Sequence, residues 1–295
     1  MVGEAMTVVE FLVSACITVL VAGAALSAVA PLQRAFAAQP EAASLTQRAR
    51  VVSEVLSGDL RQASLLLPIR IGDVDDDPAR GVFYRSDVVT VLTDPMEALA
   101  RGLVAPSTSR TYHRKRDGEG VWQLMQYDGH ASDQPAVEDV VDLAFEYFGE
   151  ANPPAAVVTQ RGRTRATYGP APPAAGVDDP GDSWGAGENC TFANNGGGHV
   201  TRLQALGAPG IVTIPPAILT DGPWCPDAAH AFRFDADLLR VRSVRVRIRL
   251  QATAPFRGAA GPWFLNSGSA GDSARYVRDE IVFLEIAPRN VHVAR

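Results

Sequence analysis

Hydrophobic residues form one long block near the N-terminus and recur later in the chain at two different spacings. No charged residue lies between Phe11 and Gln33, and most positions in this block are Leu, Val, Ala or Ile. A bilayer is crossed by about 20 predominantly apolar residues, so the block is long enough to span a membrane. The sequence contains no second block of this kind, so we expect the remaining chain to lie on one side of that membrane.

After this block, apolar residues recur at the spacing of a helix. Four of them are expected on one helical face: Leu45, Val52, Leu56 and Leu60. The helix is expected to continue past Pro31, where the proline removes a backbone donor and is expected to kink or locally break it. Pro40 is expected to break it again, or to mark a restart capped near Ser44 or Thr46. Pro68 is expected to stop it.

Beyond Pro68 the pattern changes to the alternation typical of strands. Strands are predicted at residues 81–91, 110–113, 121–127, 140–147, 163–168, 239–251 and 278–287. Clusters of Pro, Gly and Asp separate them, and residues 169–187 form a long loop without periodicity. The pattern predicts an α+β fold, in which a long N-terminal helix packs on an antiparallel β-sheet with long loop insertions.

One carboxylate stands at the start of the apolar block. Glu10 directly precedes Phe11, and a charge in a membrane-spanning segment is unfavourable and therefore usually functional. The order from Met6 is a hydrophobic residue, Thr7, two aliphatic residues, Glu10 and then the apolar block. This order resembles the start of a type IV prepilin or of a type II secretion pseudopilin.

The resemblance implies that a prepilin peptidase removes a leader and methylates the new N-terminus. Glu10 would be the fifth mature residue, which puts the cut between Ala5 and Met6, with Ala5 where the family usually has Gly. The resemblance assigns assembly to Glu10, with Thr7 beside it, through pairing of the carboxylate with a neighbouring subunit's N-terminal amine. The implied parts are a leader (1–5), a transmembrane assembly helix (6–33), its periplasmic continuation (34–67) and a periplasmic pilin-like globular domain (68–295).

Two further segments carry the resemblance. Asp59-Leu60-Arg61-Gln62-Ala63 is similar to the helix end of larger minor pilins and J-class pseudopilins, and Pro288-Arg289-Asn290-Val291 is similar to their C-terminal ending. The implied protein sits in a bacterial inner membrane with its N-terminus cytoplasmic, and then joins a pilus or pseudopilus, at the tip because of its size. Its implied partners are other pilin or pseudopilin subunits, the prepilin peptidase and the inner-membrane assembly platform.

Two other interpretations of the N-terminal block stay open. Ala28-Val29-Ala30 and Ala35-Phe36-Ala37 have the small-x-small pattern of signal-peptide cleavage sites, which would make the protein an exported soluble binding protein or enzyme. A simple membrane-anchored periplasmic protein would need no cleavage.

Charge and cysteine content narrow the possible partners and compartment. The formal net charge is -6, so no nucleic acid is expected as a partner. Cys16 lies in the apolar block, whereas Cys190 and Cys225 flank a stretch rich in Gly, Asn and Pro. In an oxidising compartment these two are expected to form a disulfide, with two free buried thiols as the alternative.

Signals for a cofactor or for catalysis are weak. Four acids crowd one short loop and are weak calcium candidates: Asp73, Asp75, Asp76 and Asp77. They lack the Gly and distal Glu of an EF-hand, so a solvated acidic turn is the preferred interpretation, and no cofactor is expected, with calcium as the alternative. A second, weaker candidate is Asp178, Asp179 and Asp182. The histidines match no metal motif and no serine lies in a nucleophile elbow, so the protein is not expected to be an enzyme.

The predicted strand at 239–251 alternates arginine with aliphatic residues. Its arginines are Arg240, Arg242, Arg245, Arg247 and Arg249. The alternation slips at Ser243-Val244, which predicts a β-bulge. The preferred interpretation is a solvated face over a packed one, and the alternative is a docking face for acidic groups of a neighbouring subunit.

Overall fold

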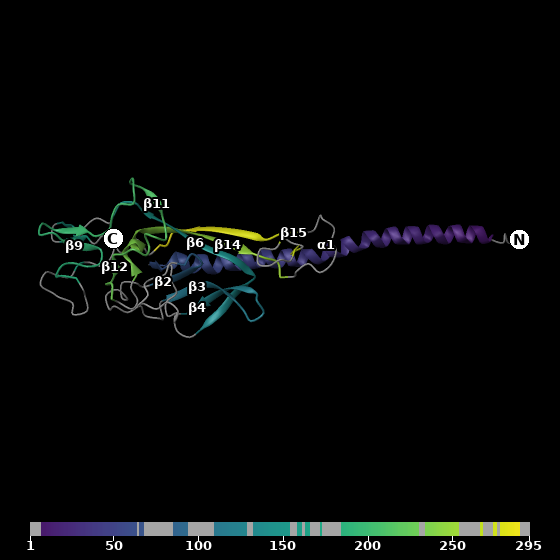
Figure 1. Ribbon diagram of the computed structural model, residues 1–295, viewed down its shortest axis with the longest axis horizontal. Helices are drawn as coiled ribbons and strands as arrows, with labels where there is room; N and C mark the ends of the chain where they lie inside the picture. The colour runs from purple at the N-terminus through teal and green to yellow at the C-terminus, as the bar shows by residue number, and fades with distance from the viewer. Residues whose placement is uncertain are drawn as a thin grey trace. The chain divides into compact units, whose positions relative to one another are not determined.

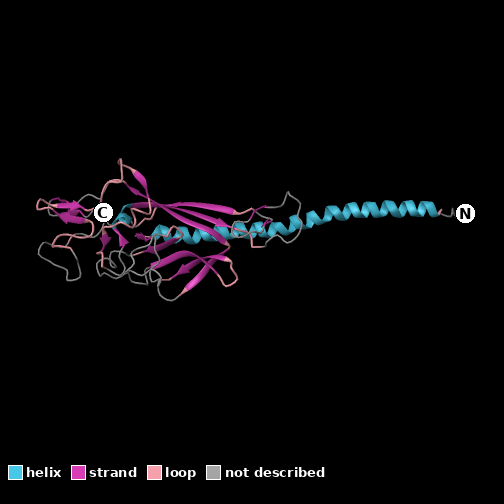
Figure 2. Ribbon diagram, viewed as in Figure 1, coloured by secondary structure: helices cyan, strands magenta, loops and turns pink. Residues whose placement is uncertain are grey.

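The computed structural model describes residues 7–63, 65–67, 85–93, 109–128, 132–153, 158–160, 163–165, 172, 184–229, 234–253, 266–267, 274–275 and 278–289. The fold is α+β, with one long N-terminal helix and antiparallel β-sheets (Figures 1 and 2). The chain divides into two compact units, Met1–Gln47 with Gln251–Asp279 and Arg48–Leu250 with Glu280–Arg295.

The N-terminal helix α1 spans Val8–Gln62 and continues through both Pro31 and Pro40 (Figure 2). The expected continuation of the helix past Pro31 is confirmed, whereas the local break and the capped restart do not occur. Ser44 and Thr46 lie inside the helix, where the Thr46 hydroxyl donates a hydrogen bond to the Ala42 carbonyl at 3.0 Å. Proline removes one helical hydrogen bond, but its φ is close to that of a helix, so the bonds of neighbouring turns hold the backbone helical.

The predicted apolar face of this helix is confirmed. Val52, Leu56 and Leu60 are all 0 % exposed, and Leu45 is also buried. The helix ends at Gln62, before the predicted stop at Pro68. The Arg61 carbonyl accepts a hydrogen bond from the Arg289 amide at 2.9 Å, which gives this end of the helix a partner outside it.

A five-stranded antiparallel sheet follows the helix directly. Its strands, in spatial order, are β1 (Leu65–Leu67), β2 (Val88–Leu92), β3 (Ser109–Arg116), β4 (Trp122–Tyr127) and β5 (Asp133–Glu138). All five residues of β2 are buried. The buried hydroxyls of Thr90 and Thr111 lie 2.8 Å apart across β2 and β3, so each polar group has a partner.

A four-stranded antiparallel sheet contains the longest strands. Its spatial order is β11 (Ile211–Ile214), β6 (Val140–Glu150), β14 (Val241–Leu250) and β17 (Glu280–Ile286). Val244, Val246 and Ile248 are buried and alternate with arginines, as the sequence predicted. The register between β14 and β6 shifts between Val241 and Ser243, which confirms the predicted bulge and places it slightly earlier.

The arginine strand begins later than predicted because a 3-10 helix, η3 (Ala236–Arg240), precedes it. The prediction at 163–168 overlaps a strand at Arg163–Arg165, and residues 166–168 lie outside the described residues. The remaining strands pair locally: β7 (Val158–Gln160) with β8 (Arg163–Arg165), β9 (Phe192–Asn194) with β10 (His199–Thr201), β12 (Trp224–Cys225) with β13 (Phe234–Asp235), and β15 (Asn266–Ser267) with β16 (Ala274–Arg275).

Candidate functional site

The first part of α1 is apolar and exposed. Val8–Ser27 is 20 residues long, is apolar enough to cross a membrane, and has 0 % of its most apolar window buried within the structure. Phe11, Leu12 and Leu20 are among its exposed side chains. An apolar surface of this extent is unfavourable in water, so the segment is suited to a bilayer or to contact with other apolar helices. As a structural feature it fits a membrane anchor or a signal sequence.

Glu10 and Thr7 form a capping box at the start of α1. The backbone amide and the hydroxyl of Thr7 each donate to one Glu10 carboxylate oxygen at 2.9 Å, and the Glu10 amide donates to the Thr7 hydroxyl at 3.3 Å. Such reciprocal bonds satisfy donors that the first turn of a helix otherwise leaves unpaired. The structure thus brings together the two residues assigned to assembly. Ala5 and Met6 lie outside the described residues.

The other end of α1 is attached to β3 by a second carboxylate. Arg110 donates to both oxygens of Asp59, at 2.9 and 2.8 Å, and the Tyr112 hydroxyl donates to Asp59 at 2.6 Å. Burial raises the pKa of Tyr112 above its ordinary value, and the hydrogen bond to Asp59 raises it further, so the phenol stays protonated as a donor. Because Arg61 bonds to Arg289, the helix-end motif and the C-terminal motif also lie together.

The predicted disulfide is present. The Cα atoms of Cys190 and Cys225 are 5.1 Å apart in a bonded pair, and both residues are buried. The Trp184 indole donates to the Pro226 carbonyl at 2.6 Å, and the Arg202 guanidinium stacks on the Trp184 ring at 4.3 Å. These contacts organise residues 184–229, which we call the disulfide insertion. Cys16 is a free, exposed cysteine.

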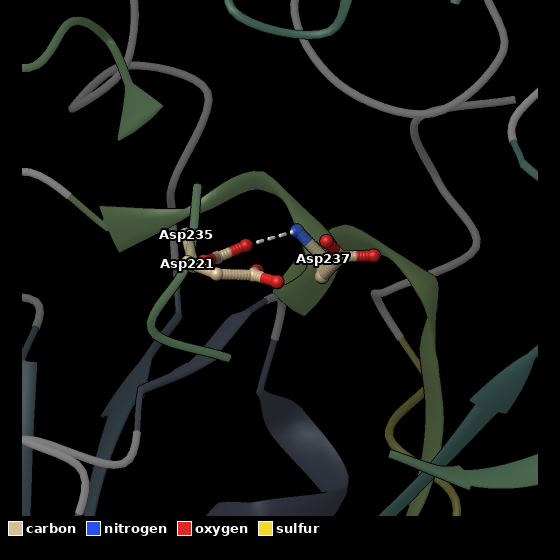
Figure 3. Close-up of side chains that lie close together, drawn as sticks. All are labelled: Asp221, Asp235 and Asp237. Carbon is tan, nitrogen blue, oxygen red and sulfur yellow. Dashed lines mark hydrogen bonds between the residues drawn. The ribbon is translucent and has the colours of Figure 1, made fainter. Parts of the chain in front are cut away.

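Sequence reasoning missed a cluster of acids beside this insertion. Carboxylate oxygens of Asp221, Asp235 and Asp237 all lie within 4.8 Å of one another (Figure 3). Asp235 is 0 % exposed and Asp237 is 5 % exposed, whereas Asp221 is exposed. Asp235 caps η3 by accepting from the Asp237 amide at 2.8 Å, and it also accepts from the Gly222 amide at 2.6 Å.

Arg240 provides positive charge next to these acids. It is 0 % exposed, its Nε lies 2.6 Å from an oxygen of Asp237, and it donates to the carbonyls of Ala151, at 3.1 Å, and Gln204. We call these four charged residues, Asp221, Asp235, Asp237 and Arg240, the aspartate–arginine cluster. Its signal in the sequence is the Asp-x-Asp pair followed by Arg three residues later, a spacing that joins side chains within one helical turn.

The cluster has the oxygen ligands that calcium prefers, but its guanidinium already balances part of the negative charge. Burial raises the pKa of Asp235 to about 6 and that of Asp237 to about 7. Burial also lowers the pKa of Arg240. The arrangement is a largely buried ion network in which Asp235 and Asp237 hold protons more readily than a free aspartate does. The calcium candidates Asp73, Asp75, Asp76 and Asp77, and the weaker set around Asp178, lie outside the described residues.

The arginines of η3 and β14 divide into two groups. Arg247 pairs with Asp142 at 3.0 Å, and Arg245 lies 3.7 Å from Glu146 and 3.6 Å from Glu285 on a partly exposed face. This part fits the expected solvated face. The expectation is wrong for Arg240 and Arg242, which are buried. The 3-10 helix and the bulge turn these two inward, where Arg242 pairs with Glu150 at 2.8 Å.

No protein family, curated protein or solved structure matches the chain.

Proposed function

We propose that this protein is a minor pilin or pseudopilin, processed by a prepilin peptidase between Ala5 and Met6. It would then assemble, at the tip, into a type IV pilus or a type II secretion pseudopilus. The observation that carries the proposal is the exposed apolar part of α1 with the Thr7–Glu10 capping box at its first turn. The similarity of Asp59–Ala63 and of the C-terminal ending to the same family adds support.

The proposal is based on the surroundings that an exposed apolar helix with one acidic residue requires. The helix needs a bilayer before assembly and the apolar helices of other subunits afterwards. A carboxylate in either environment needs a cationic partner, and the amine exposed by cleavage of a neighbouring subunit is such a partner. Until then, the Thr7 amide and hydroxyl hold Glu10 at the helix start.

The proposal assigns the remaining parts accordingly. The protein sits in the inner membrane with its N-terminus cytoplasmic and its globular part periplasmic. Its partners are other pilin or pseudopilin subunits, the peptidase and the assembly platform. The protein acts as a structural subunit, not an enzyme. The disulfide between Cys190 and Cys225 is consistent with an oxidising compartment such as the periplasm.

The first test is the mature N-terminus, determined by mass spectrometry of protein taken from the native membrane. The proposal predicts N-methylated Met6. A start near Pro31 or Ala38 would instead identify a signal peptide and an exported soluble protein. An unprocessed start would identify a simple membrane anchor. Either of these results would refute the proposal.

A second test separates the capping role of Glu10 from its proposed role in assembly. Glutamine can replace glutamate in a capping box but carries no charge to pair with an amine. We expect Glu10→Gln to insert into the membrane normally but to appear in sheared surface fibres at a several-fold lower level than wild type, by quantitative immunoblot. Glu54→Gln, on an exposed helical position, is the matched control and should assemble normally. Normal assembly of Glu10→Gln would contradict the proposal.

A further inference from the structure

The aspartate–arginine cluster joins four separate pieces of the second unit. Asp221 lies in the disulfide insertion, Asp235 on β13, and Asp237 and Arg240 on η3 (Figure 3). Arg240 reaches the end of β6 through Ala151 and the insertion through Gln204. The Gly222 amide, also in the insertion, donates to Asp235 at 2.6 Å. Contacts of the cluster therefore help to hold the insertion on the sheet.

The charges of the cluster do not balance when every group is ionised. Three carboxylates then face one guanidinium, and Asp235, Asp237 and Arg240 are all at most 5 % exposed. Buried like charges at short distance favour the protonated form of one of them. A proton from solvent that binds to a carboxylate oxygen removes one excess negative charge, and no metal ion or other ligand is needed for this.

The described elements in contact with η3 and β13 bring apolar or already paired groups. Where β6 ends and β14 begins, Glu150 and Arg242 pair with each other at 2.8 Å. The strand β1, which contacts η3, contributes buried Leu66, and β12, which pairs with β13, contributes Trp224 and the disulfide-bonded Cys225. Among these described groups, the charge balance depends on the three aspartates and Arg240.

The pKa values of the two buried aspartates are both raised. Burial raises the pKa of Asp235 to about 6, and the charge of Asp221 adds to this, against the backbone hydrogen bonds from Asp237 and Gly222. Burial raises the pKa of Asp237 to about 7, against the attraction of Arg240 and together with the charges of Asp235 and Asp221.

We propose that the aspartate–arginine cluster is a proton-dependent latch, which binds protons in mildly acidic solution to fasten the disulfide insertion and loosens it above neutral pH. The ordinary pKa of aspartate is 3.8, so an unfolded or detached segment gives up its protons first as the pH rises. The stabilisation is therefore complete below about pH 4, falls as the pH rises to about 7, and is then lost. This inference is independent of the proposed function.

Amide hydrogen exchange of the full chain in detergent tests the latch, with rates corrected for the intrinsic effect of pH. The exchange rates of the Gly222 and Asp237 amides report directly on the cluster, because Asp235 accepts a hydrogen bond from each of them. We expect strong protection at about pH 5 and several-fold faster exchange at about pH 8. Equal protection at both pH values would overturn the proposal.

A pair of variants with equal charge change separates the latch from a general effect of charge. Asp221→Asn removes one exposed charge from the cluster and should lessen the loss of protection at about pH 8. Asp142→Asn, in the exposed pair with Arg247, is the control and should leave the pH dependence as in wild type. An equal effect of both variants would overturn the proposal. The proposal would also be overturned if millimolar calcium restored the protection of the wild-type protein at about pH 8, because a metal ion would then be the ligand.

Discussion

At the scale of single residues, Gly149 shows how closely the four-stranded sheet is packed. A Cβ atom at this position would lie 2.5 Å from Cδ1 of Ile214 and 2.6 Å from the carbonyl oxygen of Arg240. The Ile214 side chain can shift, but the Arg240 carbonyl belongs to the backbone at the end of η3. Gly149 is therefore required for the close approach of this backbone to β6.

We predict that Gly149→Ala lowers the free energy of unfolding by about 1–3 kcal/mol, the usual cost of overpacking a core. Urea unfolding of the full chain in detergent, followed by tryptophan fluorescence, measures the change. The control is Gly58→Ala on α1, where a new Cβ would meet nothing within 4 Å. Alanine is the better helix former by about 1 kcal/mol, so the control should be neutral or stabilising. Equal effects of the two substitutions would contradict this account.

The arginines show that the burial of a single residue cannot be predicted from local alternation alone. Alternation placed Arg245 and Arg247 on a solvated face, where the structure finds them in ion pairs. The same alternation gave no reason to treat Arg240 differently, although it is fully buried. Its environment depends on Ala151 and Gln204, which are distant in sequence. Local periodicity carries no information about such contacts.

At the scale of elements, the joint between α1 and β3 depends on one carboxylate. Asp59 accepts hydrogen bonds from Arg110 and from the buried Tyr112. Its removal would leave the Tyr112 hydroxyl without this acceptor inside the protein, and hydrogen bonds to charged groups contribute about 1.5–3 kcal/mol. The joint is thus expected to make a measurable contribution to stability.

We predict that Asp59→Ala lowers the free energy of unfolding by about 1.5–3 kcal/mol, measured by urea unfolding, and that Asp59→Asn, which keeps an acceptor oxygen, has a smaller effect. The control is Glu54→Ala, five residues earlier on the same helix. Glu54 pairs with Arg50 at 2.8 Å on an exposed surface, and such pairs contribute about 0.3–0.5 kcal/mol. The prediction fails if Asp59→Ala is no more destabilising than this control.

Long elements could be predicted from the sequence because their period repeats often enough to be recognised. The strands β6, β14 and β17 have 11, 10 and 7 residues, and each overlaps a predicted strand. The strands β9 to β13 have 2 to 4 residues and were not predicted, since alternation has no meaning over so short a length. The helix was expected to continue past Pro31 and does so, but the local break or restart expected at the prolines is absent. A local penalty at Pro31 and Pro40 did not outweigh the continuous helix on either side.

At the scale of the whole molecule, the sequence predicted the apolar helix and the disulfide but not the aspartate–arginine cluster. An apolar block without charges has few possible environments, and a pair of cysteines around a Gly-rich stretch has few possible partners. The aspartate–arginine cluster forms only when the insertion folds back, so that Asp221 meets Asp235 and Asp237. That arrangement depends on tertiary contacts over many residues, which no local pattern encodes.

The disulfide is expected to be the main covalent restraint on the insertion. Cys190 and Cys225 are separated by 35 residues, and cross-linking a loop of this length stabilises a protein by about 3–4 kcal/mol in the chain-entropy model. We predict that replacing both cysteines by alanine lowers the free energy of unfolding by this amount, measured by urea unfolding without reductant. Cys16→Ala, at the free exposed cysteine, should change it by no more than about 0.5 kcal/mol.

Reductant distinguishes loss of the cross-link from loss of packing by the two buried side chains. Wild type and Cys16→Ala should both fall toward the stability of the double variant when the disulfide is reduced, whereas the double variant should not respond. If the fully reduced wild type kept its stability, the two cysteines would act in the fold only as small buried residues. The chain-entropy contribution would then be absent, and the insertion would be held by noncovalent contacts such as those of Trp184 and Arg240.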